Sequence, residues 1–224
     1  MTDLTILFYS ACRVEEPFAS RVREHLLSVI GDTPLVSVTH EALDFGENYV
    51  YAGQPVSAYT LYKQVLIAAK IAMTRYVACA EDDCLYTKSH FEMRPPDDET
   101  FIYNKARFWL EADGRYRWRD RTGFHACIAP REFLIDTLKK RFEKYPVHPE
   151  GRKGLDGWAE PGRYEWYLKL PKVKMEYVYS DEPVLTFNHK GSLGGQRKTR
   201  ETDIIKTDLE PWGSAAEVWH RFHD

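Results

Sequence analysis

YVACAEDDCLY, from Tyr76 to Tyr86, joins an apolar run to three consecutive carboxylates, Glu81, Asp82 and Asp83. The run Tyr76–Ala80 has no alternation of apolar and polar residues, which is typical of a strand buried on both faces of a parallel sheet. The acids follow the carboxyl end of that strand, where open α/β sheets bind their ligands. This stretch therefore predicts an α/β fold with a ligand site at the acids.

The three carboxylates also indicate what the ligand site holds. Adjacent negative charges are costly unless a cation lies among them, and hard oxygen ligands suit Mg²⁺ or Mn²⁺. The alternative is a solvated acidic turn, although turns that follow strands more often use Gly, Asn or Pro.

The composition fits one domain kept inside a cell. The chain has 224 residues, of which 43% are hydrophobic, enough to bury a full core. Its net charge of −3 does not demand a polyanionic partner. No apolar run approaches the roughly 18 residues of a membrane span, and Arg13, Glu15 and Glu16 interrupt any signal-peptide core. The four cysteines form no CxxC pair and no ligand spacing with a histidine, which disfavours zinc and disulfides. We expect a cytoplasmic protein with no membrane partner.

Strand and helix patterns alternate in the first half of the chain. Apolar runs predict strands at 4–11, 35–39 and 76–80, and helical periodicity predicts helices at 16–30 and 58–74. Alternation of this kind predicts parallel βαβ units.

The second half has a different pattern, which predicts a mixed sheet. Strands are expected at 101–110 and 124–128, joined by a charged turn at 111–123, and again at 173–179 and 184–188. Helices are expected at 131–145, at 163–170 and near the end of the chain.

An opening α/β half, an acidic triplet near residue 80, mixed strands after it and a histidine in the last third together resemble a glycosyltransferase of the GT-A fold. The resemblance implies a single domain over 1–224, with a Rossmann-like nucleotide-sugar half (1–88), an acceptor-facing half (89–187) and a C-terminal flap and helix (188–224). In that family an Asp-x-Asp or Glu-Asp-Asp element binds the divalent ion that bridges the two phosphates of a sugar nucleotide. The match implies Asp83 as a metal ligand, with Glu81 or Asp82 reaching the ribose or the sugar.

FNHKGSLGGQRKT, from Phe187 to Thr199, is the second segment that the resemblance covers. It implies His189 as a further metal ligand, with a structural histidine as the alternative. Its glycines would let the backbone approach a ligand, while Lys190, Arg197 and Lys198 would hold the diphosphate as a closing flap. The alternative is a solvated loop.

By the same resemblance, the inverting members of the family use a carboxylate after the middle strands to take the proton from the acceptor hydroxyl. Glu160, in DGWAEPG, is in the expected stretch, with Asp156 and Glu165 as rivals. The adjacent acid pair usual in the family is absent, and a surface carboxylate is the alternative.

The resemblance places further nucleotide contacts in the first half of the chain. Ser10, Ala11 and Arg13 follow the first strand, where such enzymes contact the base and ribose. Lys63 falls in a second nucleotide-facing region, although it can equally be a solvated residue of a core helix.

Two segments near the end of the chain bear on the acceptor. FNHKGSLGG and the ending LEPWGSAAEVW look similar to small bacteriophage-type glycosyltransferases that modify hydroxymethylated bases of DNA, and the location would then be the host cytoplasm. The basic, aromatic stretch 105–121 would contact duplex DNA. A bacterial glycan or a small molecule is the alternative acceptor. Two alternatives to a glycosyltransferase are also open. One is a metal-dependent nucleotidyltransferase or nuclease, and the other is a non-catalytic nucleic-acid-binding module.

Overall fold

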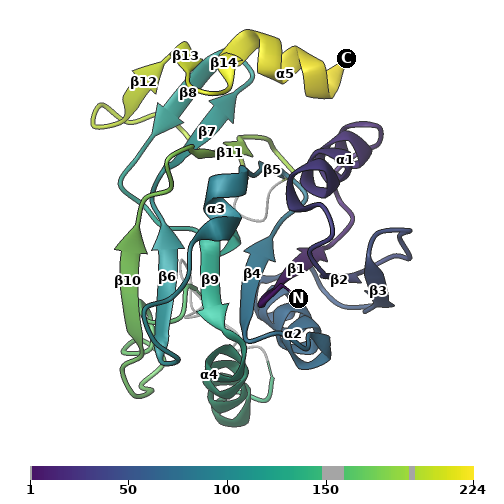
Figure 1. Cartoon of the computed structure of the whole chain (residues 1–224), viewed down its shortest axis with the longest axis vertical. Coiled ribbons are helices and arrows are strands. Elements are labelled where there is room, and N and C mark those ends of the chain that lie inside the picture. Colours follow the sequence, from purple (N-terminus) through teal and green to yellow (C-terminus); the bar gives the residue numbers. More distant parts are fainter. Residues whose placement is uncertain (1, 148–158, 192–194) are drawn as a thin grey trace.

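A seven-stranded mixed sheet forms the centre of the molecule (Figure 1). The computed structural model describes residues 2–147, 159–191 and 195–224. The strand order is β10-β6-β9-β4-β1-β2-β3, with β9 antiparallel to both of its neighbours and every other pair parallel. The strands are β1 (Leu4–Ser10), β2 (Leu35–Thr39), β3 (Glu47–Val50), β4 (Tyr76–Ala80), β6 (Thr100–Asn104), β9 (Cys127–Pro130) and β10 (Lys174–Val178).

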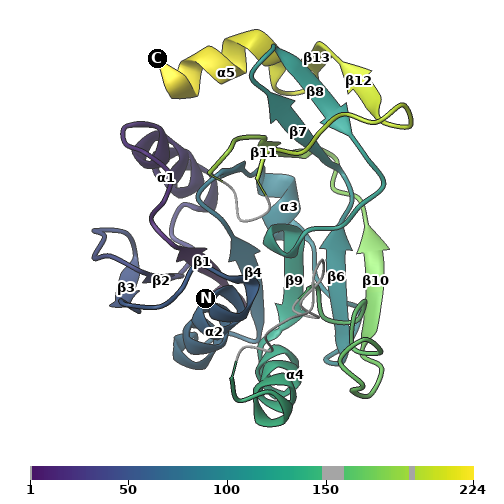
Figure 2. The same cartoon turned by 180° about the vertical axis from the view of Figure 1, so that it is seen from behind.

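Helices cover both faces of this sheet, as Figures 1 and 2 show from opposite sides. Alternate residues of β1 point to opposite faces: Leu7 packs with α2 (Ala58–Ile71) and α4 (Arg131–Lys144), whereas Phe8 packs with α1 (Phe18–Ile30) and α3 (Lys88–Glu92). The hydroxyl of Ser57 caps α2 by accepting the Thr60 backbone N–H. A sheet buried on both faces explains why β1 and β4 lack polar alternation.

A second, five-stranded sheet stands at the other end of the molecule, with α5 (Ala215–His223) packed on it (Figure 2). Its order is β12-β8-β7-β11-β5. Its strands are β5 (Cys84–Leu85), β7 (Arg107–Glu111), β8 (Arg115–Trp118), β11 (Val184–Phe187) and β12 (Ile204–Lys206), and a separate ribbon joins β13 (Asp208–Leu209) to β14 (Gly213–Ser214). The chain passes from the first sheet to the second through residues 81–83, between β4 and β5.

The expected α/β class with a mixed central sheet is confirmed, and so are the parallel pairings of β1 with β2 and β4. The single strand expected at 101–110 is wrong. It divides into β6 and β7, in different sheets, because the side chain of Asn104 accepts the backbone N–H of Ala106 and turns the chain. The expected turn at 111–123 contains strand β8.

The helix expected at 163–170 is also wrong, because this segment forms a series of turns. The side chain of Glu165 points inward to the guanidinium of Arg141, and Lys169 adopts a φ of 52°, which ends any helical path. The strands β3, β12, β13 and β14 were not expected from the sequence.

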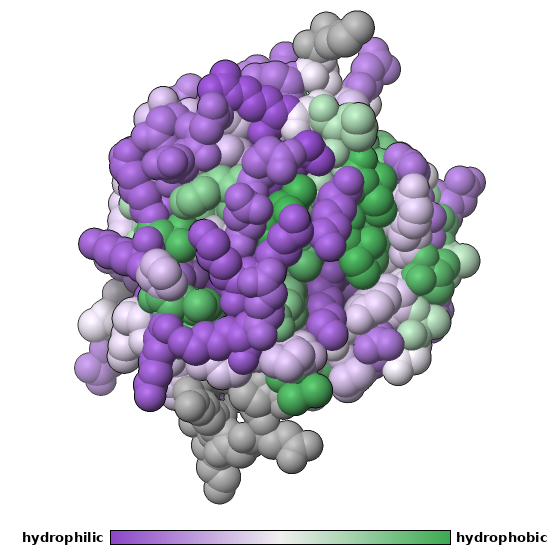
Figure 3. Space-filling view, turned by 90° about the horizontal axis from the view of Figure 1, so that it is seen from below, coloured by the Kyte–Doolittle hydropathy of each residue, from purple (hydrophilic) through white to green (hydrophobic). Residues whose placement is uncertain are grey.

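No helix among the described residues is long and apolar enough to cross a membrane. The end of the molecule seen from below in Figure 3 is mainly hydrophilic, with hydrophobic groups only in small patches.

Candidate functional site

The three acids of residues 81–83 lie where the two sheets meet, and each carboxylate has a different partner. The Tyr9 hydroxyl donates to Oε1 of Glu81 at 2.8 Å, and the Ser10 hydroxyl donates to Asp82. Both partners come from the carboxyl end of β1, which pairs with β4. Side chains of the neighbouring strand therefore hold Glu81 and Asp82 in place.

Asp83 contacts His189, which follows β11. Nε2 of His189 lies 3.1 Å from Oδ2 of Asp83, and the backbone N–H of Gly191 donates to Nδ1 at 3.1 Å. The hydrogen bond with Asp83 raises the pKa of His189. In the neutral ring this pattern assigns the proton to Nε2, from which it is donated to Asp83.

Burial governs the protonation of the other two acids. Burial, followed by the charge of Asp83, raises the pKa of Glu81 to about 8 and that of Asp82 to about 6. Without a cation, the cluster therefore opposes full ionisation of its three carboxylates. A positive charge placed among these acids would be strongly stabilised.

A first cavity, which we call the α2 cavity, opens between the end of β1, the start of α2 and the acids. Gln64 shapes its floor by donating to the carbonyls of Ser10 and Val38, at 2.9 and 2.8 Å. Nε2 of His40 is buried there and has no hydrogen-bond partner among the described residues. The residues that line the cavity are Tyr9, Ser10, Ala11, Arg13, Val14, His40, Val56, Ser57, Thr60, Leu61, Gln64, Glu81, Asp82, Asp83, His189 and Gly191.

A second cavity, the arginine cavity, lies on the other side of the acids. Glu81 and Asp83 line both cavities, so a ligand in either one meets the same two carboxylates. The other residues of the arginine cavity are Arg107, Trp109, Arg121, Thr122, Gly123, His125, Glu160, Thr186, Phe187, Asn188 and Arg197. Its three guanidinium groups set it apart from the α2 cavity.

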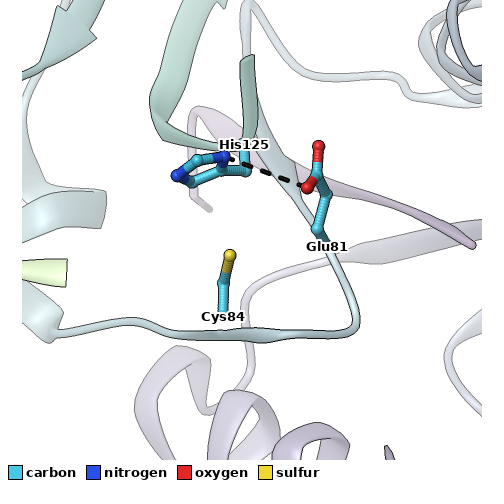
Figure 4. Close-up of side chains that lie close together, drawn as sticks. All are labelled: Glu81, Cys84 and His125. Carbon is cyan, nitrogen blue, oxygen red and sulfur yellow. Dashed lines mark ion pairs between the residues drawn. The ribbon is translucent and has the colours of Figure 1, made fainter. Parts of the chain in front are cut away.

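Glu81, Cys84 and His125 form a further group that could hold a metal ion, since one ligand atom of each lies within 4.8 Å of the others. Figure 4 shows the three side chains close together, and Nδ1 of His125 lies 3.9 Å from Oε2 of Glu81. Tetrahedral zinc needs ligand atoms about 3.3–3.7 Å apart, so these side chains would have to close in. Burial raises the pKa of the Cys84 thiol and lowers that of His125, which favours a protonated thiol beside a neutral ring.

The structure brings together most of the residues singled out in the sequence. The α2 cavity gathers Ser10, Ala11, Arg13, Glu81, Asp82, Asp83 and His189, and the arginine cavity gathers Glu81, Asp83, Glu160 and Arg197.

The remaining predicted residues lie elsewhere. Among the described residues, Lys63, Lys190 and Lys198 line neither cavity, and the ammonium group of Lys63 lies 4.7 Å from the centre of the Tyr59 ring. Glu165, the rival base, is buried in an ion pair with Arg141. Asp156 lies outside the described residues.

Several lining residues were not found from the sequence. His40, Gln64 and His125 stand far from the acidic triplet along the chain, in segments with no motif of their own. The only signal for Arg107 and Arg121 was their place in the basic, aromatic stretch 105–121. Several cations of that stretch already form ion pairs within the protein, because Lys105 pairs with Asp120 and Arg119 pairs with Asp203.

No protein-family model matches the sequence, and no curated protein matches it. Among solved structures, a nucleotidyl transferase from Methanothermobacter thermautotroptrophicus is similar at a TM-score of 0.47 and 15% identity, over 80% of this chain and 88% of that one. A glycosyltransferase involved in the glycosylation of the major capsid of PBCV-1 is similar at 0.48 and 11%, over 82% and 92%. S. aureus TarS 1-349 in complex with UDP-GlcNAc is similar at 0.46 and 12%, over 88% and 62%. Because these likenesses are partial, we infer function from the geometry of the site.

Proposed function

We propose that this protein is a metal-dependent glycosyltransferase of GT-A type, which moves a sugar from a nucleotide diphosphate sugar to a hydroxyl group of an acceptor. The observation that carries the proposal is the pairing of Asp83 with His189 at the end of β4, with a cavity on either side of the acids. A transferase must bring two substrates to one point, and two cavities that share Glu81 and Asp83 provide for this.

Asp83 and His189 are the residues that would hold the metal, Mn²⁺ or Mg²⁺. Adjacent ligands of a six-coordinate ion with bonds near 2.1 Å lie about 3 Å apart, and the two side-chain atoms are separated by 3.1 Å. Binding through Nε2 requires the ring proton on Nδ1, so the hydrogen bond from Gly191 would have to break. When bound, the ion would neutralise the charge that develops on the departing nucleoside diphosphate.

The α2 cavity would hold the nucleoside of the donor. Ser10 and Asp82 offer a hydroxyl and a carboxylate for the ribose, and the unpartnered Nε2 of His40 offers a polar contact for the base. Arg13 is exposed beside this cavity and available to a phosphate. Of the predicted diphosphate contacts of the flap, Lys190 and Lys198 are exposed and would have to move to reach it, and Arg197 lines the arginine cavity instead.

Glu160 would act as the base for the acceptor. It lines the arginine cavity across from Glu81 and Asp83, and the Thr122 hydroxyl donates to its Oε1 at 3.4 Å. In the transfer, the acceptor oxygen forms a bond to the anomeric carbon while the bond from that carbon to the phosphate oxygen breaks. Glu160 takes the hydroxyl proton, and the nucleoside diphosphate leaves with the electron pair.

A hydroxymethylated base of duplex DNA remains a proposed acceptor. What supports it is the charge and aromatic content of residues 105–121, although several of these cations are ion-paired within the protein. Transfer of labelled sugar to hydroxymethylated DNA but not to unmodified DNA of the same sequence would support it, and absence of transfer to both would contradict it.

The proposed function is tested by thermal unfolding with nucleoside diphosphates, with and without Mn²⁺. We expect a stabilisation of about 5–10 °C at a ligand concentration 100 times the dissociation constant, only when both components are present. Asp83→Asn should abolish it. The matched control Asp98→Asn, which changes an exposed ion pair with Arg75, should retain it.

Three outcomes would contradict the proposal. The first is no stabilisation by any nucleoside diphosphate. The second is release of pyrophosphate from a nucleoside triphosphate and glucose 1-phosphate, which would identify a nucleotidyltransferase. The third is nucleic-acid binding that needs no divalent ion and survives Asp83→Asn, which would identify a non-catalytic binding module.

A further inference from the structure

Arginines gather around one aromatic ring at the arginine cavity. The guanidinium carbons of Arg107, Arg117 and Arg119 lie 4.8, 4.5 and 5.4 Å from the centre of the Trp109 ring. Such contacts with the face of an aromatic ring stabilise cations only partly. The remaining charge has to be balanced by anions.

The protein supplies those anions on the side away from the cavity. Arg117 is fully buried and pairs with Glu111 and with Asp203, and Arg119 pairs with Asp203 at 2.5 Å. The Asp203 side chain is itself buried, and its hydrogen bond from Arg119 holds its pKa far below the usual range. Neither Arg117 nor Arg119 lines the cavity.

The arginines that do line the cavity have no such partner. In the described part of the chain, Arg107, Arg121 and Arg197 make no ion pair with a carboxylate. Arg107 is only 4% exposed, and it donates to the backbone carbonyls of Arg121 and Thr122. A buried guanidinium held only by neutral groups is costly, unless a ligand brings the opposite charge.

The charges of this group also oppose one another. Burial lowers the pKa of Arg107 to about 10, and the charge of Arg121 contributes in the same direction, whereas the carboxylates of Glu160 and Glu81 in the same cavity act against it. Burial and then the charge of Arg121 lower the pKa of Arg197. An oxyanion among the three would relieve this repulsion, and the planar guanidinium group binds carboxylate and phosphate oxygens in pairs.

We propose that the arginine cavity binds an acceptor, a small molecule or glycan, that carries a phosphate or carboxylate group held by Arg107, Arg121 and Arg197. Calling this ligand the acceptor rests on the proposed function. We place this anion apart from the diphosphate of the donor, because two of the proposed donor contacts, Ser10 and His189, line only the α2 cavity, whereas Asp83 lines both. Glu160 lies in the same cavity, so a hydroxyl of an acceptor anchored through its anion comes within range of the proposed base.

Isothermal titration with three related sugars tests the inference. Glucose 6-phosphate, glucuronate and neutral glucose are titrated into the protein, alone and with saturating UDP and Mn²⁺. We expect at least one of the two anions to bind tenfold or more tightly than glucose, with or without UDP. Arg121→Gln and Arg197→Gln should each weaken that anion tenfold or more, while Arg115→Gln, a control at a partly exposed arginine paired with Asp113, should not.

The inference is overturned if glucose binds as tightly as both anions, or if the affinity for the anion is the same in Arg121→Gln and Arg197→Gln as in the unmodified protein. It is also overturned if UDP competes with the anion, because the anion would then occupy the diphosphate site.

A second arm separates the two sources of the anion. UDP-glucuronate and UDP-glucose should bind equally, whereas an Arg121-dependent preference for UDP-glucuronate would assign the charge to the donor sugar and overturn the assignment to the acceptor. If UDP fails to bind while the anion binds with the expected arginine dependence, the proposed function fails and the anion site stands.

Discussion

Asp83 and His189 are 106 positions apart in the sequence, yet their side chains lie 3.1 Å apart at the junction of the two sheets. Asp83 is brought there by the end of β4, and His189 by the end of β11, which pairs with β5. The backbone N–H of Phe187 donates to the carbonyl of Asp83 at 2.9 Å, so the two segments are joined by the main chain as well. The pair is therefore positioned by the fold before any ligand binds.

Replacing His189 should weaken metal binding more than it weakens the fold. We expect His189→Gln to raise the dissociation constant for Mn²⁺ in the presence of UDP about 10- to 100-fold, because one ligand atom is lost. Titration calorimetry measures the change, and His220→Gln, at an exposed histidine, serves as the control. An unchanged constant in His189→Gln would exclude His189 as a ligand.

Replacing Glu160 should affect catalysis and leave donor binding intact. We expect Glu160→Gln to lower kcat about 10²- to 10⁴-fold, the usual contribution of a general base, with UDP affinity unchanged. Glu176→Gln, at an exposed glutamate, should retain full activity. A kcat within twofold of the unmodified enzyme would remove Glu160 from the mechanism.

The buried ion pair of Arg141 and Glu165 fixes the segment that carries Glu160. Arg141 also donates to the carbonyl of Ala159 at 2.7 Å. Arg141→Met leaves the Glu165 carboxylate buried without its partner, and we expect the free energy of unfolding in urea to fall by about 3–5 kcal/mol. Arg75→Met breaks an exposed pair and should cost no more than about 1 kcal/mol. Equal losses in the two variants would contradict this account.

Buried histidine makes the protein less stable in acid. Burial lowers the pKa of His90 to about 3, from an ordinary value of 6.5, so the unfolded chain binds a proton in this interval and the folded chain does not. Keeping His90 neutral therefore contributes fully to the free energy of unfolding above pH 6.5, and this contribution is lost as the pH falls toward 3.

We expect the loss of stability between pH 6.5 and 5 to be about 2 kcal/mol smaller in His90→Gln than in the unmodified protein. Urea unfolding at several pH values measures the two slopes, and His220→Gln should keep the original slope. Identical slopes in His90→Gln and the unmodified protein would show that His90 titrates normally in the folded state.

Gly46 supports the edge of the seven-stranded sheet. Its φ is +63°, and a Cβ atom there would lie 2.6 Å from both Cγ and the carbonyl oxygen of Leu35. Gly46→Ala should therefore reduce the free energy of unfolding by about 3 kcal/mol or more, through backbone strain and overpacking. Gly53 has a φ of +71° and no atom within 4 Å, so Gly53→Ala should cost only about 1–2 kcal/mol. Equal costs would show that Leu35 moves away freely.

Strands β1 and β4 of the central sheet could be predicted because they are buried along their whole length and helices alternate with them, whereas the exposed edge strand β3 could not. The second sheet could be predicted only in part: β11 matches the strand expected at 184–188. Strand β5 has only two residues and β12 (Ile204–Lys206) only three, so neither is long enough to give a recognisable strand pattern. The break between β6 and β7 depends on the side chain of one residue, Asn104, which lies between two segments rich in aromatic residues.

The candidate site divides in the same way. The acids were evident because they are adjacent in the sequence and follow a buried strand. The arginine cavity was not evident from the sequence, because Arg107, Glu160 and Arg197 come from separate segments that only the tertiary fold brings together. Their individual types are common on protein surfaces and carry no local signal.

Residues 81–83 are the whole connection between a strand of one sheet and a strand of the other. The fold thus depends on the length of this segment, whereas the chemistry of the site depends on its side chains. Exchanging an acid for its amide changes charge and leaves the span intact, whereas adding or deleting one residue displaces β5 from its pairing with β11. In a library of variants, substitutions here should yield folded and inactive proteins, while insertions and deletions should yield none that fold.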